Sequence, residues 1–179
     1  EHAMFGTVRE RTGGALPGIS PSNTYPTSDG SFVVIAGNSD PIFRRLMRAI
    51  DRNDLADDAA LATNPGRVLR NAELDAAITH WTSGLHIDAV LAALDAADVP
   101  AGRIYSAADI VADPHYRARG MLLETTLPDG QPITLPGIVP KLSATPGRMH
   151  WTGPALGEHT DQVLATLGMT AAAIATASG

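Results

Sequence analysis

The chain has 179 residues, of which 44% are hydrophobic and 18% charged, a balance typical of a globular fold rather than a disordered segment. Its formal net charge of −6 argues against a nucleic-acid partner, because phosphate binding needs clustered lysine and arginine. The absence of cysteine excludes disulfides, thiolate metal sites and cysteine nucleophiles. No apolar run approaches the roughly 20 residues that span a bilayer, and no secretory signal opens the chain. The sequence therefore predicts a cytoplasmic protein without membrane contact.

Residues 1–22 are predicted to form a linker that contains a glycine-rich loop. The loop, Thr12–Gly18, combines glycine, proline and threonine. Its composition favours a flexible linker, and the alternative is a flap whose glycines allow close backbone approach to a substrate. Met4 is internal, so we expect the chain to be cut from a longer one, with an expression scar as the alternative.

A β-hairpin is predicted after this linker. Asp29-Gly30 lies between two β-prone stretches, and both residues tolerate the positive φ that hairpin turns require. The second stretch, the apolar run Phe32–Ala36, predicts a buried strand.

Helices are predicted over most of residues 38–97. Asn38 or Ser39 caps the first of them, Pro41 suits its first turn, and Asn71 caps a later one. The inward faces are given by apolar residues at helical spacing: Ile42, Phe43, Leu46, Met47, Ile50, Leu74, Ile78, Trp81, Val90, Leu91 and Leu94.

The rest of the chain predicts a short edge strand over 103–106, a helix after Ser106, and a second hairpin around Asp129-Gly130. A final amphipathic helix is predicted over Glu158–Gly168, and a weaker one follows it. In the helix over Glu158–Gly168, the residues expected to point inward are Val163, Leu164 and Leu167. The fold class is therefore α+β: a small domain over 23–147, with a short antiparallel sheet and surrounding helices, flanked by the linker 1–22 and a C-terminal arm over 148–179.

Little catalytic equipment is visible in the residues themselves. No histidine pairs with another histidine or a carboxylate at a known metal spacing, and no G-x-S-x-G elbow is present. The segment Asn38-Ser39-Asp40 lies where a strand passes into a helix, a place that attracts anions. Ordinary helix capping explains the same residues and is the favoured interpretation. The sequence thus predicts no metal site and shows little catalytic equipment, although composition does not exclude a Ser-His-Asp triad.

The order of several short motifs resembles the class III CoA-transferase family, also called the CaiB/BaiF family. Each motif is weak alone, but the ordered set covers nearly the whole chain. The matching segments are Thr12–Gly18, Tyr25–Gly30, Asn38–Arg45, Asn64–Asn71, Val99–Gly102, Asp109–Gly120 and Leu156–Gly168.

This resemblance implies an enzyme that moves coenzyme A from an acyl-CoA donor to a small carboxylic acid. The acyl-CoA thioester is a substrate, and no tightly bound cofactor is expected. An aspartate nucleophile forms mixed-anhydride and thioester intermediates. It would lie upstream of this chain in a large domain, so the resemblance implies no catalytic residue in this chain. The chain would then be the small domain and C-terminal arm of a homodimeric enzyme, inactive when expressed alone.

The resemblance also implies two groups of substrate-binding residues. Gly13, Gly14 and Gly18 would form a flap that shields the anhydride from water, although Ala15 and Leu16 depart from the most glycine-rich version of the loop. The residues bordering the acyl pocket would be Asn38, Ser39 and Asp40.

Two alternatives stay open at this point. The first is an α-methylacyl-CoA racemase of the same fold, in which a glutamate at the position like Asp40 supports a catalytic histidine. The shorter side chain of Asp40 weakens that interpretation. The second is a binding module without catalysis.

Overall fold

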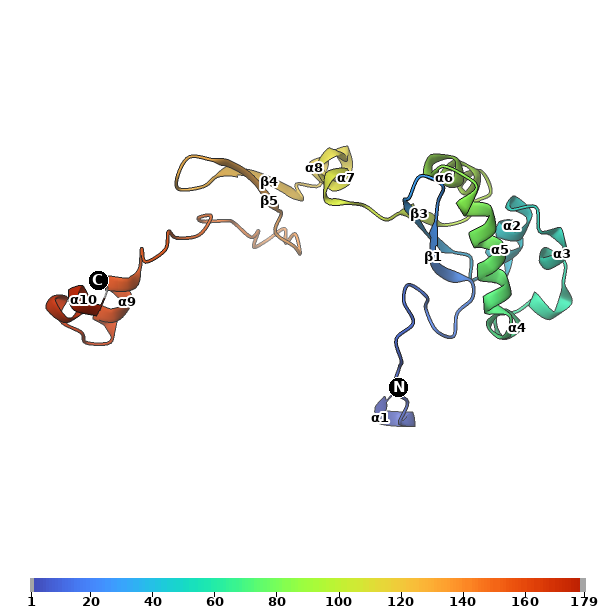
Figure 1. The fold of residues 1–179 in the computed structure, drawn as a ribbon, viewed down its shortest axis with the longest axis horizontal. Helices are drawn as coiled ribbons and strands as arrows, with labels where there is room; N and C mark the ends of the chain where they lie inside the picture. The colour runs from blue at the N-terminus through green and yellow to red at the C-terminus, as the bar shows by residue number, and fades with distance from the viewer. Residues whose placement is uncertain (1, 178–179) are drawn as a thin grey trace. The chain divides into compact units, whose positions relative to one another are not determined.

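The computed structural model describes residues 2–177, and its contacts divide the chain into two compact units (Figure 1). Unit 1 comprises residues 1–104 and unit 2 comprises residues 105–179. The boundary falls inside the domain expected over 23–147, so the two divisions do not coincide. The expected ranges stay a prediction about the whole protein.

A three-stranded antiparallel sheet forms the centre of unit 1. Its strands are β1 (Ser22–Pro26), β2 (Phe32–Ala36) and β3 (Ala101–Arg103), in the spatial order β1-β2-β3. The hairpin between β1 and β2 turns at Asp29-Gly30, as predicted, and pairs Tyr25 with Val33. The edge strand lies about two residues before its expected position.

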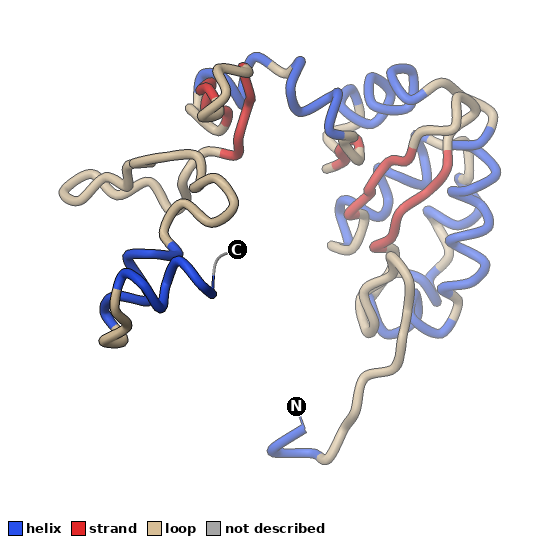
Figure 2. Tube along the Cα trace, turned by 60° about the vertical axis from the view of Figure 1, so that its left-hand side comes forward, coloured by secondary structure: helices blue, strands red, loops and turns tan. Residues whose placement is uncertain are grey.

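Most helices of unit 1 lie between the second and third strands in sequence, and two of them, α5 and α6, pack against the sheet (Figure 2). The fourth and fifth α-helices are consecutive, with one residue between them. The helical elements of unit 1 are α1 (His2–Phe5), α2 (Asp40–Ala49), α3 (Asn53–Ala56), the 3-10 helix η1 (Ala59–Leu61), α4 (Asn64–Leu69), α5 (Asn71–Ser83) and α6 (Ile87–Ala96).

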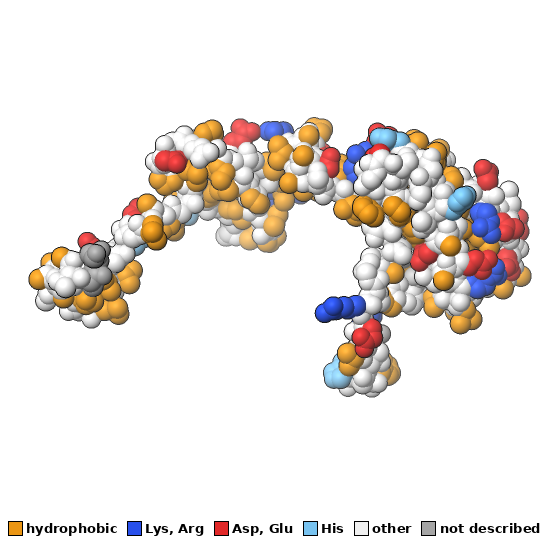
Figure 3. Space-filling view, viewed as in Figure 1, with side chains coloured by type: hydrophobic (Ala, Val, Ile, Leu, Met, Phe, Trp, Pro, Cys, Tyr) orange, Lys and Arg blue, Asp and Glu red, His pale blue; other side chains and the backbone are white. Residues whose placement is uncertain are grey.

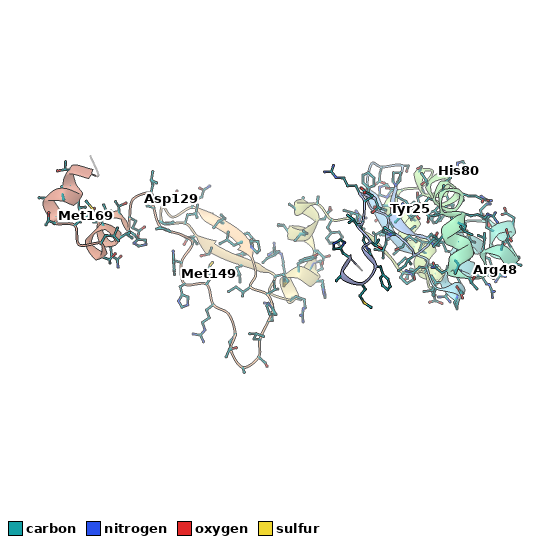
Figure 4. All side chains as sticks on the ribbon, turned by 90° about the horizontal axis from the view of Figure 1, so that it is seen from below. Tyr25, Arg48, His80, Asp129, Met149 and Met169 are labelled. Atoms are coloured by element: carbon teal, nitrogen blue, oxygen red, sulfur yellow. The ribbon has the colours of Figure 1, made fainter. Side chains whose placement is uncertain are left out.

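The core of unit 1 lies between the sheet and these helices. Figure 4 labels Tyr25, which is 1% exposed in this layer, and Arg48, which lies at its outer rim. Most of the apolar positions expected to point inward are buried there. The core residues are Tyr25, Val33, Ile35, Phe43, Leu46, Met47, Ile50, Leu55, Ala56, Leu61, Leu74, Ile78, Ile87, Val90, Leu94 and Val99.

Strand β2 is buried on one face only, which corrects the expectation of a buried strand. Val33 and Ile35 point into the core, whereas Phe32 and Val34 are 50% and 42% exposed. Successive side chains of a strand point to opposite faces, and the helices cover one of them. The continuous apolar run therefore predicted the strand but not its exposure.

Helix capping follows the sequence in one case and departs from it in another. The Ser39 side chain accepts a hydrogen bond from the Ile42 amide at 3.4 Å, so Ser39 caps α2 as predicted. The prediction for Asn71 was wrong, because Arg70 is the cap of α5 and Asn71 is its first residue. The Asn71 side chain instead donates a hydrogen bond to Asp75 and accepts one from the Ser20 hydroxyl.

Unit 2 is built from short elements joined by long connections. Its helix α7 begins with a capping box in which Ser106 and Asp109 bind each other's backbone, and the hairpin β4–β5 forms where Asp129-Gly130 predicted it. The elements are α7 (Ala107–Ala112), α8 (Pro114–Ala118), β4 (Leu122–Thr126), β5 (Pro132–Pro136), α9 (Thr160–Thr166) and α10 (Ala171–Ala177).

Unit 2 buries very little of its apolar surface. Among its described residues Ile174 is the one buried side chain, and Figure 3 shows many hydrophobic side chains at its surface. The prediction that Val163 and Leu167 point inward was wrong, because these residues, on α9 and at its C-terminal cap, are 53% and 73% exposed. Within this unit α9 packs against the short α10, which is too small to cover both residues.

None of the described helices is both long and apolar enough to cross a membrane.

The tip of the first hairpin docks on the start of α6 through Asp29. Its Oδ1 accepts hydrogen bonds from the Thr27 hydroxyl at 2.6 Å and the Ile87 amide at 3.3 Å. Its Oδ2 accepts a third from the Ser31 hydroxyl at 2.9 Å. These bonds stabilise the charged carboxylate, the Thr27 bond most of all, and lower the pKa of Asp29 to about 2.

Asp29→Asn is expected to flatten the acid limb of the stability curve of this chain. The pKa of Asp29 is about 2 in the folded state, below its ordinary value. The carboxylate therefore contributes stability above the unfolded pKa, and this contribution is lost as the pH falls toward 2. Urea unfolding between pH 5 and pH 2 measures the effect. Asp129→Asn, at the turn of the other hairpin, is the matched control, and an equal flattening there would contradict the prediction.

Candidate functional site

A fully buried arginine joins three separate segments of unit 1. Arg67 is 0% exposed, and its guanidinium donates to the carbonyl oxygens of Ser20 at 2.9 Å, Leu61 at 3.1 Å and Asn38 at 2.8 Å. It also binds Asp40 Oδ1 at 2.7 Å. We call this arrangement the Arg67 cage, with Ser20, Asn38, Asp40 and Leu61 as its acceptors.

The guanidinium suits this place because it offers several donors in one fixed plane, each aimed at a different acceptor. Its Cζ lies 5.0 Å from the centre of the Phe43 ring, which adds a cation–π contact beneath the plane. A buried charge without partners costs several kcal/mol, whereas each of the three guanidinium nitrogens of Arg67 donates to at least one acceptor. Among the described residues no buried polar side-chain atom lacks a hydrogen-bond partner.

The local sequence explains how Arg67 reaches this position. Pro65 lies in the first turn of α4, where the missing amide hydrogen costs nothing. Gly66 follows, and a Cβ there would lie 1.8 Å from the Ala60 carbonyl oxygen. The glycine therefore lets α4 approach η1 closely enough for Arg67 to bind the Leu61 carbonyl.

Two asparagines on either side of Arg67 bind the same stretch of chain. Asn64 donates from Nδ2 to the Gly18 carbonyl at 2.9 Å and accepts from the Ser20 amide at 3.0 Å. Asn71 accepts from the Ser20 hydroxyl at 2.6 Å. Residues 18–20 thus have both backbone and side-chain groups bound by one short segment, and this fixes the C-terminal base of the glycine-rich loop.

A second layer of polar contacts orients Asn71. Asp75 Oδ2 accepts from Asn71 at 2.9 Å and from Asn23 at 3.1 Å. Asp75 Oδ1 accepts from the Tyr25 hydroxyl at 2.6 Å. Burial and the neighbouring Asp75 carboxylate raise the pKa of Tyr25, so this hydroxyl remains a donor at neutral pH.

The structure brings four of the predicted site residues together around the Arg67 cage. Asn38 and Asp40 are two of its acceptors, and Ser39 between them caps α2. Gly18 reaches the same region through Asn64, with a φ of +80° that favours glycine. Asp40 remains 50% exposed, so its carboxylate is accessible to solvent although Arg67 binds one of its oxygens.

The other two predicted residues lie in the glycine-rich loop itself. Gly13 occupies the tip of the loop with a φ of +64° and has open space around it. Gly14 packs on the strand, where a Cβ would lie 1.9 Å from Thr24 Oγ1 and 3.3 Å from Asn23 Oδ1. Gly13 is therefore required by backbone conformation and Gly14 by close approach.

A shallow hollow of about 250 Å³ lies beneath the glycine-rich loop. Leu16, Ile19 and Val68 give it apolar walls, and Ser20 and Asn71 give it polar ones. In the part of the chain that the structure describes, no three histidine, cysteine or carboxylate side chains gather in a way that could hold a metal ion.

Sequence reasoning singled out the segment Asn64–Asn71 as a motif but missed the function of its arginine. The spacing of Asn64, Arg67 and Asn71, three and four residues apart, places them near one face of consecutive helical turns. That spacing indicates that the three side chains bind a common segment of the chain. The sequence could not predict which segment, because most of the acceptors are backbone carbonyls.

Comparison with known proteins finds a matching family and relatives that are named as enzymes. A family model described as CoA-transferase family III matches residues 1–160. The succinyl-CoA–D-citramalate CoA-transferase of Chloroflexus aurantiacus is 45% identical over 93% of this chain and 42% of its own length. The succinate–glutarate CoA-transferase of Agrobacterium fabrum is 39% identical over 88% of this chain and 39% of its own.

A solved structure shows the same architecture. A CAIB/BAIF family protein from Brucella suis matches with a TM-score of 0.71 and 34% identity, over 93% of this chain and 42% of that protein. The chain thus spans about two fifths of the length of the relatives that it matches.

Arg67→Met is expected to lower the free energy of unfolding by about 3 kcal/mol or more. The substitution leaves three backbone carbonyls without their donor, and each buried unsatisfied group costs about 1–3 kcal/mol. Urea unfolding followed by circular dichroism measures the loss. Arg48→Met removes an exposed arginine whose partner is Asp57 and is the control. A loss at position 67 no larger than at position 48 would show that the cage contributes little.

Gly14→Ala is expected to displace the glycine-rich loop from β1, and Thr24→Ala is expected to restore it. In the single variant the new methyl group meets Thr24 Oγ1, whereas in the double variant the nearest remaining Thr24 atom lies 3.3 Å away. Limited proteolysis across Thr12–Gly18 measures loop displacement. Equal cleavage of the single and double variants would contradict the proposed contact.

Proposed function

This chain belongs to CoA-transferase family III, and from that membership we propose that the whole protein moves coenzyme A from an acyl-CoA donor to a carboxylic acid. The observation that carries the proposal is the 45% identity to the Chloroflexus citramalate enzyme over 93% of the chain. The aligned part includes the Arg67 cage and the predicted substrate-binding residues, since the family model spans residues 1–160.

The proposed donor is succinyl-CoA and the proposed acceptor a short dicarboxylate. The relatives reported above are named for succinyl-CoA with D-citramalate and for succinate with glutarate. Another relative from Chloroflexus, 34% identical, is named for succinyl-CoA with L-malate. These acceptors share two carboxylates on a short carbon chain, so that shared chemistry defines the class.

The proposed mechanism uses an aspartate that lies outside this sequence. Its carboxylate attacks the thioester carbonyl of the donor, the CoA thiolate leaves, and an acyl-aspartyl anhydride forms. The thiolate then attacks the aspartyl carbonyl, which releases the donor acid and leaves an aspartyl-CoA thioester. The acceptor carboxylate and CoA repeat the two steps in reverse, and the aspartate is restored.

In this mechanism the chain described here supplies walls and cover rather than the nucleophile. The glycine-rich loop, with Gly13, Gly14 and Gly18, excludes water from the anhydride. Asn38, Ser39 and Asp40 border the acyl group. We also propose that the protein is a cytoplasmic homodimer, as the sequence and the family resemblance implied.

The racemase alternative gains no support from the relatives reported above, which are all named CoA-transferases. Asp40 Oδ1 is also bound to Arg67 at 2.7 Å, so this carboxylate already has a strong partner within unit 1.

The longer protein that contains this sequence is expected to form acyl-CoA from succinyl-CoA when D-citramalate, L-malate or glutarate is supplied. Liquid chromatography of the CoA esters measures the product, and acetate serves as a monocarboxylate control. The 179-residue chain alone is expected to give no transfer, because the proposed nucleophile lies outside it. Transfer by the chain alone would overturn the assignment of the nucleophile, and absence of transfer to every dicarboxylate would overturn the proposed function.

A further inference from the structure

Arg67 connects the two groups of residues that the proposed function places around the acyl group. Its Nε donates to the Ser20 carbonyl, two residues after the glycine-rich loop. Its Nη2 donates both to the Asn38 carbonyl and to Asp40 Oδ1, at the start of α2. Because the guanidinium is planar and rigid, these bonds fix the separation of the two segments.

Further contacts show that the connection is direct and close. The Gly37 amide donates to the Pro21 carbonyl at 3.1 Å, immediately beside the cage. A Cβ on Gly37 would lie 3.1 Å from Pro21 Cγ, so the segments around Pro21 and Gly37 are in tight contact. A displacement of the loop base must therefore move the residues before α2, or break the bonds to Arg67.

Arg67 itself cannot touch a substrate, because it is 0% exposed. Its effect must pass through the accessible groups that it binds, of which Asp40 is half exposed and Asn38 partly buried. In the proposed mechanism these groups must stay within a fraction of an ångström of their productive positions, because misplacement by about 1 Å can cost about 100-fold in rate.

On these grounds we infer that Arg67 is a positioning residue for CoA transfer, which couples the base of the glycine-rich loop at Ser20 to the pocket segment Asn38–Asp40. The inference rests on the proposed function for its catalytic half. Its physical half, the coupling of the two segments, stands on the contacts of the Arg67 cage alone.

The kinetic test uses the longer protein with Arg67→Lys and Asn64→Ala. Lysine keeps the charge but not the planar fork, and Asn64→Ala removes the bonds to Gly18 and Ser20 while Arg67 stays in place. We expect both variants to lower kcat for transfer, Arg67→Lys by about 10- to 100-fold, with KM for succinyl-CoA unchanged. Hydrolysis of succinyl-CoA relative to transfer is expected to rise in both.

Two controls separate positioning from stability. Ile78→Val removes one methyl group from a fully buried side chain and lowers stability without touching the cage. Arg48→Lys repeats the arginine-to-lysine change at an exposed pair on α2. If kcat and the ratio of hydrolysis to transfer change no more in Arg67→Lys and Asn64→Ala than in Ile78→Val, the inference is overturned.

The coupling is tested without activity by amide hydrogen exchange in the longer protein. Asn64→Ala should raise exchange in peptides over 16–22, where Asn64 binds the chain. It should also raise exchange over 37–43, where Asn64 makes none of the hydrogen bonds described above. If exchange rises only over 16–22, the coupling of the two segments is overturned. Asn64→Ala provides this test even if Arg67→Lys does not fold.

If the wild-type protein shows no CoA transfer, the proposed function and the catalytic half of the inference are both overturned. Hydrogen exchange then still tests the coupling of the two segments.

Discussion

The burial of one guanidinium determines how the segments of the candidate functional site are arranged in unit 1. Arg67 has no exposed surface, and its bonds go to three backbone carbonyls and one carboxylate. A charge in such a place is tolerable only when its donors are well matched, because the desolvation cost is several kcal/mol. The segments that carry Ser20, Asn38 and Leu61 must therefore meet around it, although they are distant in the sequence.

This constraint explains why loops rather than regular elements carry the candidate site. The loop base at Gly18–Ser20 and the segment Asn38–Asp40 have few backbone partners in helices or strands, and side chains from the start of α4 and α5 satisfy them instead. Loops arranged in this way combine an accessible surface with fixed positions. That combination suits a site that must order a substrate and exclude water.

Much of this fold was predictable because local chemistry determined it. Asp29-Gly30 specified the first hairpin, and Ser39 with Pro41 specified the start of α2. The expected roles of Asn71 and of β2 failed because tertiary contacts decided them: Asn71 binds Ser20 and Asp75, and β2 has helices on one face. The Arg67 cage was beyond sequence reasoning, since its acceptors lie up to 47 positions away and are mostly main-chain atoms.

The chemical nature of those acceptors has a consequence for how the sequence can drift over generations. A main-chain carbonyl is present whatever side chain its residue carries, so replacements at Leu61 and Asn38 leave the corresponding acceptor in place. No other amino acid reproduces the fork of donors at position 67. Selection on this part of the protein should therefore fall on the single donor far more heavily than on the residues that accept from it.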